Sequence, residues 1–102
     1  MEEKYLDPYH YSGDNRDIRE EIRIEEGITK IMSCAFWSLP FLKRIIIPTT
    51  VQEIEIWAIV NCWSLKEVVF LGTEKQWKKI KRPRSNGWYH NSGKPKIIFT
   101  EN

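Results

Sequence analysis

The sequence has few of the residues on which catalytic and metal sites are usually built. Of its 102 residues only two are histidines, His10 and His90, and two are cysteines, Cys34 and Cys62. These four residues lack the paired spacing of metal ligands, and two cysteines are too few for a disulfide scaffold. The five glycines stand singly along the chain, so no glycine-rich phosphate-binding loop is present. We therefore expect no enzyme activity and no metal or cofactor site.

Long apolar runs are also missing from the sequence. No segment reaches the roughly 20 apolar residues of a membrane-spanning helix. The first seven residues, MEEKYLD, contain no apolar stretch of the kind found in secretory signals. With the two free cysteines, this favours a soluble protein in the reducing cytoplasm that does not bind membranes. A secreted or surface location is expected only if the chain is a fragment of a longer protein.

A repeat of one fixed length dominates the middle of the chain. Eight apolar residues between Ile22 and Leu42 recur 23 positions later, and the first two recur again as Val68 and Phe70. A stack of such units buries the apolar edge of each repeat against the next one. Because only two repeats are complete, the terminal segments must supply further buried area, or the chain must dimerise.

The repeat contains two kinds of local pattern. Alternating residues rich in β-branched side chains at 22–24, 45–47 and 68–70 predict short strands, which stacking would place side by side as a parallel ladder. The Ala-Phe and Ala-Ile dipeptides at 35–36 and 58–59 are expected in brief helical turns. Each repeat is therefore predicted to contain one ladder strand and one helical turn.

Residues 18–72 are expected to form the core of a single globular domain, between an N-terminal arm or cap at 1–17 and a C-terminal capping segment at 73–102. The polar, tyrosine-containing N-terminal segment predicts an irregular arm over the first repeat. In the alternative interpretation, the acidic residues of this segment are groups that recognise a partner. Residues 1–30 carry nine acidic and five basic side chains, a net charge of −4, whereas residues 75–102 carry eight basic and one acidic, a net charge of +7. Such polarity can steer a partner.

The C-terminal segment contains recognisable start and stop signals. Thr73 and Gln76 have the spacing of a capping box, which predicts a helix that begins at Glu74. Pro83 is expected to halt this helix. The apolar, β-branched stretch at 96–100 predicts a last strand.

One set of residues follows the pattern Leu-x-x-Ile-x-Ile-Pro, then Val-x-x-Ile, then Ala and a Cys with a returning Leu. The matching residues are Leu42, Ile45, Ile47, Pro48, Val51, Ile54, Ala58, Cys62 and Leu65. Together with the closing element at 70–80, this pattern resembles the BspA-like subclass of bacterial leucine-rich repeats over about residues 18–80. The resemblance implies a scaffold for protein binding without catalytic residues, in a family of mostly exported or surface-associated adhesins and host-contact proteins.

The chain departs from that family pattern at four positions. Met32 and Glu55 stand where the family has glycine, Leu39 replaces the cysteine and Ile59 the second phenylalanine. These departures loosen a turn without upsetting the core. The fold expected from repeat and resemblance together is α/β: a short leucine-rich-repeat-like solenoid with a parallel strand ladder, short helical turns and a C-terminal helix-strand cap.

The outward side of the strand ladder is the main candidate surface. If alternate strand residues point inward, Arg23, Ile46 and Val69 point outward. Arg44 and Glu67 then form a row of alternating charge with Glu21, which is favourable across neighbouring strands. We predict a partner-binding face; alternatively the N-terminal arm or a second copy covers it, or it is simply exposed. Its candidate residues are Arg23, Arg44, Ile46, Glu67 and Val69.

A basic tract near the C-terminus is the candidate for an alternative, nucleic-acid-binding function. Cations beside stackable rings such as Trp77 and Trp88 suit phosphates and single strands. In the competing interpretation Trp77 is buried beside Ile80 and the cations form a solvated cap, which could also contact an acidic protein. The tract comprises Lys75, Lys78, Lys79, Lys81, Arg82 and Arg84.

The sequence as a whole favours a non-catalytic protein–protein interaction module. A small intracellular adaptor or inhibitor of a protein partner fits the compact chain, one version being a phage or mobile-element inhibitor of a host enzyme. The alternatives are a nucleic-acid-binding protein and a fragment of an exported BspA-like surface or adhesion protein. Trp37, Trp57 and Trp63 are expected on the edge opposite the ladder, where any exposed ring would be a binding anchor.

Overall fold

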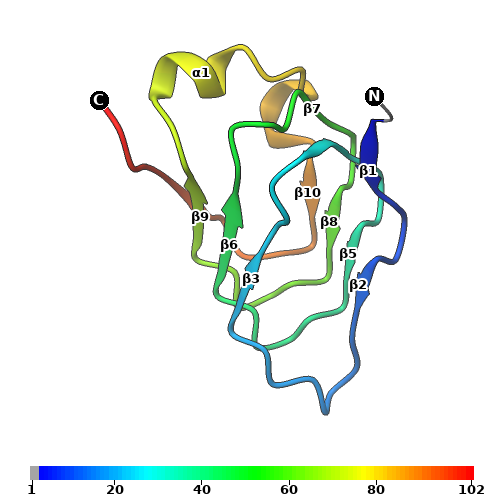
Figure 1. Cartoon of the computed structure of the whole chain (residues 1–102). Coiled ribbons are helices and arrows are strands. Elements are labelled where there is room, and N and C mark those ends of the chain that lie inside the picture. Colours follow the sequence, from blue (N-terminus) through cyan, green and yellow to red (C-terminus); the bar gives the residue numbers. More distant parts are fainter. Residues whose placement is uncertain (1–2) are drawn as a thin grey trace.

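The chain folds into a stack of short coils whose strands form three parallel sheets (Figure 1). The computed structural model describes residues 3–102. We name the sheets A (β1-β4-β7), B (β10-β8-β5-β2) and C (β11-β9-β6-β3). The strands are β1 (Lys4–Leu6), β2 (Tyr11–Ser12), β3 (Glu21–Arg23), β4 (Ile28–Ile31), β5 (Phe36–Trp37), β6 (Arg44–Ile47), β7 (Glu53–Ile54), β8 (Ile59–Val60), β9 (Glu67–Phe70), β10 (Tyr89–His90) and β11 (Lys96–Phe99).

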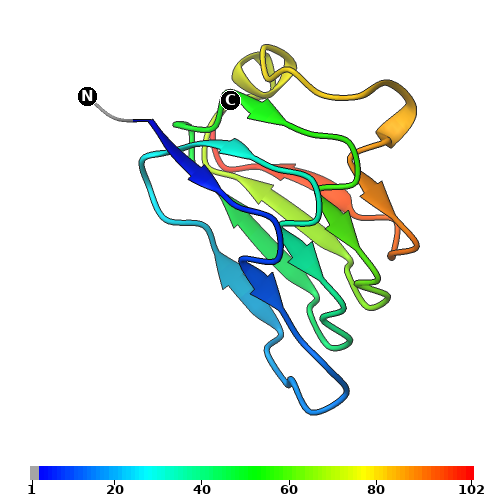
Figure 2. The ribbon, with the colours of Figure 1, turned by 90° about the vertical axis from the view of Figure 1, so that its right-hand side faces the viewer.

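Each complete coil places one strand in each sheet, and corresponding strands pair in parallel with those of the next coil. Ile22, Ile45 and Val68 are aligned across sheet C, and Ile31 is aligned with Ile54 across sheet A. Figure 2 shows the coils from the side, with the colours running from blue at one end of the stack to orange and red at the other. The predicted parallel ladder of the strands at 22–24, 45–47 and 68–70 is confirmed, with the predicted spacing of 23 positions.

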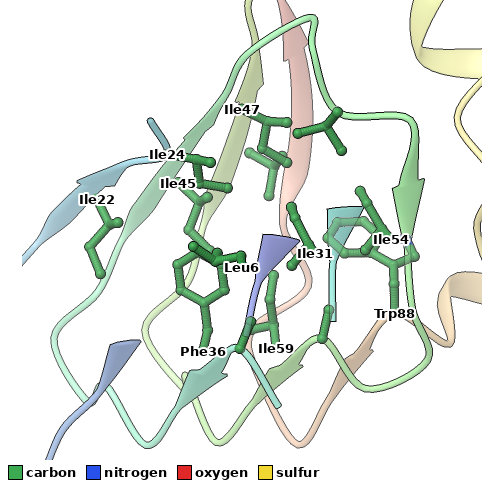
Figure 3. Packing of buried hydrophobic residues seen from close by; sticks show 14 of the residues in the cluster. Leu6, Ile22, Ile24, Ile31, Phe36, Ile45, Ile47, Ile54, Ile59 and Trp88 are labelled. Atoms are coloured by element: carbon green, nitrogen blue, oxygen red, sulfur yellow. The ribbon is translucent and has the colours of Figure 1, made fainter. Parts of the chain in front are cut away.

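The side chains between the three sheets form one hydrophobic core (Figure 3). Phe36, Leu42, Ile45 and Val68 are all 0% exposed. Burying a large apolar side chain of this kind stabilises a fold by roughly 1.5–3 kcal/mol. The inward positions that the repeat indicates are therefore the positions that hold the coils together.

The predicted helical turns at 35–36 and 58–59 are wrong, because both dipeptides lead into the strands β5 and β8 of sheet B. The backbone N–H of Phe36 donates to the carbonyl of Ala58 in the next coil (3.0 Å) instead of bonding within its own turn. Cys34 and Ser38 flank β5 with φ values of 63° and 54°. These left-handed residues prevent a right-handed helical turn and bend the chain at each side of the strand.

The prediction of an irregular N-terminal arm is also wrong. Strands β1 and β2 pair with β4 and β5, so that Leu6 is aligned with Ile31 and Tyr11 with Phe36. The aligned residues lie 25 positions apart, two more than in the repeat, which is why a search at one fixed offset misses them. This segment extends sheets A and B and buries Leu6 to 1% exposure, but adds no strand to sheet C.

The C-terminal segment contains the predicted helix and last strand, with further elements between them. The helix α1 (Glu74–Lys78) begins with the predicted capping box: Gln76 N donates to Thr73 Oγ1 at 3.1 Å, and Thr73 N contacts Gln76 Oε1 at 2.8 Å. The helix ends at Lys78, so Pro83 is not what stops it. A 3-10 turn, η1 (Arg84–Asn86), and strand β10 precede the predicted last strand, β11. Neither helix is long or apolar enough to cross a membrane in the described part of the chain.

Candidate interaction surfaces

The outer face of sheet C is formed by four strands in strict register. The alignment places Arg23 beside Ile46, Ile46 beside Val69 and Val69 beside Ile98. Arg23 is exposed, and the three aliphatic side chains are half-buried. They form an apolar row across the sheet, whose opposite side faces the core.

A second row on the same face consists of charged residues. Arg44 Nη1 lies 3.0 Å from Glu21 Oε1, and Arg44 Nη2 lies 2.6 Å from Glu67 Oε1. Hydrogen bonds with Glu67 and Glu21 raise the pKa of the Arg44 guanidinium above its ordinary value. Lys96 is aligned with Glu67 on the other side, so that the signs alternate across all four strands. Exposed pairs contribute little to stability, but these two pairs connect side chains of three neighbouring strands into one row.

The structure therefore brings all five predicted residues of this face together. Arg23, Ile46 and Val69 lie in the apolar row, and Arg44 and Glu67 in the charged row. Ile98 and Lys96 extend the two rows onto β11 and were not among the predicted residues. The alternation in the predicted last strand contained that signal, but the alignment of β11 with β9 spans 29 positions instead of 23.

The outer face of sheet B carries a group of aromatic side chains that come from four separate segments of the chain. Tyr9 meets Trp37 edge-on with ring centroids 5.3 Å apart, and Trp57 stacks on His90 at 4.1 Å. Val60 lies between Trp37 and His90 in the register and is only 3% exposed. Trp37 and Trp57 were expected at this edge, but their contacts with Tyr9 and His90 were not predicted, because neither the N-terminal segment nor the segment after the helix was expected to contain a strand of this sheet.

The three tryptophans expected on the edge opposite the ladder differ in exposure. Trp63 is 56% exposed and Trp57 46%, whereas Trp37 is half-buried. Trp63 also lines a shallow hollow with Pro40 and Ser38 at the corner between sheets B and C. Two of the three rings are thus available as binding anchors.

The basic tract presents its lysines to solvent but not its aromatic rings. Trp77 is 5% exposed and Trp88 3%, so both belong to the core. Arg82 is half-buried, and its guanidinium lies 4.4 Å from the centre of the Trp77 ring. Burial lowers the pKa of Arg82. The remaining five basic residues are exposed: Lys75, Lys78, Lys79, Lys81 and Arg84.

The two cysteines are free thiols in different surroundings. Cys62 is buried in the core, and burial raises its pKa to about 11, whereas Cys34 is half-buried. A thiol with such a raised pKa is almost entirely protonated at neutral pH and is a poor nucleophile. Residues 3–102 contain no cluster of three or more histidine, cysteine or acidic side chains arranged to hold a metal ion.

The comparisons with known proteins point to one family. The model of the BspA type leucine rich repeat region matches residues 11–82 in six copies. This range begins at the first residue of β2, and so includes a strand outside the range of the sequence resemblance. No curated protein and no solved structure matches the chain.

Proposed function

Because the chain belongs to the BspA-type leucine-rich-repeat family, we propose that it is a non-catalytic protein-interaction module that binds its partner through the outer face of sheet C. Repeat domains of this kind typically bind proteins and generally lack catalytic activity. A small adaptor or an inhibitor, which acts by occupying a surface of its partner, is the form that we propose. An inhibitor that a phage or mobile element directs against a host enzyme is one version of this proposal.

The observation that carries the proposal is the layout of the two rows on sheet C. The half-buried side chains of Ile46, Val69 and Ile98 form an apolar centre on three paired strands of the sheet. The charged row, in which Arg44 contacts Glu21 and Glu67, borders this centre. An apolar centre beside a polar rim is the usual anatomy of a protein interface. The expected partner surface is apolar with charges of both signs at its edge.

The proposal is tested by capturing the partner from lysate of the native host and measuring its affinity for variants. We expect Ile46→Asp to weaken binding about tenfold or more, since it places a charge in the desolvated centre of the interface. Arg23→Glu should weaken binding less, because Arg23 lies at the edge of the row. Ile56→Asp is the matched control: Ile56 is 58% exposed and lies outside sheet C. Undiminished binding by Ile46→Asp would exclude this face.

We propose the cytoplasm as the location of this activity. The support is that Cys34 and Cys62 are both free, as is usual in reducing compartments. Fractionation of the native host with an antibody against the chain tests the location. Recovery from the cell surface would instead favour a fragment of an exported surface or adhesion protein.

Nucleic-acid binding through the basic tract is a second candidate, favoured by the exposure of five of its cations. Binding through phosphates should weaken steeply as salt rises, by about tenfold or more between low and moderate ionic strength for several contacts. Reversing the charges of Lys78, Lys79 and Arg84 should then abolish binding to single-stranded DNA. Retention of binding in this triple variant would dismiss the candidate.

A further inference from the structure

If each coil is taken to begin with its strand in sheet C, the coil at each end of the stack is incomplete. The strands missing at one end are those present at the other. At the N-terminal end, β1 and β2 add a level to sheets A and B, but among residues 3–102 no strand precedes β3 in sheet C. At the C-terminal end, β11 adds a level to sheet C alone. Each end therefore lacks, within the described residues, the strands that the other end presents.

We propose that copies of this chain associate head to tail, with β11 of one copy pairing in parallel with β3 of the next. The same displacement places β10 of the first copy beside β2 of the second in sheet B. One copy is then displaced from the next by about 19 Å along the stack, which is four strand spacings of about 4.8 Å. In this arrangement β11 of one copy and β1 and β2 of the next together complete one coil. One placement of the second copy therefore pairs the open edges of both sheet B and sheet C.

The backbone groups at the two edges of sheet C are available for this pairing. Lys96 N and Thr100 N donate to carbonyls on the β9 side, those of Lys66 and Phe70, and Ile24 N donates to the carbonyl of Ile46 in β6. Since successive residues of a strand direct their backbone groups to opposite sides, those of Ile97 and Arg23 face away from the sheet. An open edge of this kind is a template for another strand.

The charged row of sheet C selects a second copy with this orientation and register. Across the sheet the row runs Glu21, Arg44, Glu67, Lys96. Pairing β11 with the next β3 in the existing register places Lys96 opposite Glu21 of the second copy, which continues the alternation of sign. The net charge of −4 over residues 1–30 and of +7 over residues 75–102 attracts the same two ends over longer distances.

Partly covered apolar side chains lie at both ends of the stack. Tyr89, Ile97 and Phe99 are half-buried against the C-terminal end of the core, and Tyr11 against the N-terminal end. Ile18, shortly before β3, is 78% exposed. Head-to-tail contact would remove apolar surface at both ends from water. Because the interface joins two different surfaces, repeated addition produces open chains of growing length instead of a closed dimer.

Sedimentation velocity over a range of protein concentrations tests this proposal. The wild-type chain should form dimers and then longer species as concentration rises. Raising the salt from about 50 to 500 mM should weaken association several-fold, because the screening length shortens. A wild-type chain that stays monomeric at all concentrations up to about 1 mM, or association that stops at the dimer, would overturn the proposal.

Charge reversal at the junction provides the sharper test. Lys96→Glu and Glu21→Lys should each weaken self-association about tenfold or more, because like charges then face each other. Mixing the two variants restores opposite charges wherever the two alternate and should restore association. Lys66→Glu makes the same change of net charge as Lys96→Glu at an exposed position outside the junction, so it is the control for that variant and should associate like the wild type. Failure of the mixture to associate would contradict the assigned register.

A variant with one blocked edge tests the backbone pairing. Arg23→Pro removes the N–H that faces away from β6 and leaves the β11 edge open. Alone it should be monomeric, but added to the wild type it should shorten the chains, because it binds by its C-terminal end and accepts no further copy. Long chains formed by Arg23→Pro alone would refute pairing through β3.

Discussion

The middle of the stack and its two ends have the same parallel pairing of strands, but the number of residues between paired strands differs. In the middle, Ile22, Ile45 and Val68 are aligned at one constant spacing, 23 positions along the chain. At the N-terminal end Leu6 and Ile31 are aligned 25 positions apart, and at the C-terminal end Ile59 and Tyr89 are aligned 30 positions apart. The strands stay aligned because inserted residues are placed in loops and in α1. The register of the sheets is thus independent of the exact repeat length.

The largest expected effect comes from removing the C-terminal end altogether. Trp77, Ile80 and Trp88 are 3–6% exposed and belong to the same core as the central coils. Deleting residues 73–102 uncovers that core and leaves a chain with only two complete coils. We expect this chain to aggregate or to lose its cooperative unfolding transition. Thermal unfolding followed by circular dichroism measures this. A soluble 1–72 fragment that melts cooperatively would show that the middle is independent of this end.

Point substitutions in one ladder position compare the middle with the end directly. Ile45 is 0% exposed between two neighbouring strands, whereas Ile97 is half-buried on the edge strand β11. We expect Ile45→Ala to lower the free energy of unfolding by about 3 kcal/mol and Ile97→Ala by about 1 kcal/mol. Urea denaturation of both variants beside the wild type measures the difference. Equal losses would mean that β11 is as well packed as β6.

The same contrast explains which parts of the fold could be predicted from the sequence. The strands at 22–24, 45–47 and 68–70 and the core positions followed from one constant spacing. The strands at Tyr11 and Tyr89 did not, because their spacing from the repeat is different. Strands β5 and β8 were mistaken for helical turns because each has two residues, too few for alternation to be visible. The left-handed backbone at Cys34 and Trp57 has no glycine to mark it.

The candidate face was predictable for the same reason as the ladder. Once Ile22, Ile45 and Val68 point inward, strand geometry places Arg23, Ile46 and Val69 outward. The extension of the face onto Ile98 requires the pairing of β11 with β9, which no constant spacing indicates. The sequence therefore indicates the centre of the surface and not its C-terminal border.

Cys62 should make the stability of the central coils depend on pH, whereas Cys34 should not. Burial raises the pKa of Cys62 from 9.0 to about 11, so the folded state binds its proton more tightly than the unfolded state. The stability from this proton is fully present below pH 9 and falls as the pH rises from 9 to 11, by up to about 2–3 kcal/mol. Cys62→Ala should remove this part of the pH dependence in urea denaturation. Cys34→Ala is the matched control and should retain it.

The smallest expected effect distinguishes central from terminal charges in the row on sheet C. Arg44 has a carboxylate on each side, at Glu21 and Glu67, whereas Lys96 has a strand neighbour on one side only. Arg44→Gln should lower Tm by a few degrees at low salt, and Lys96→Gln by less, because exposed pairs contribute little to stability. Dilute samples measure this intrinsic difference. At high concentration the loss from Lys96→Gln should grow, because Lys96 then faces Glu21 of a second copy; a difference that is the same at every concentration would contradict head-to-tail pairing.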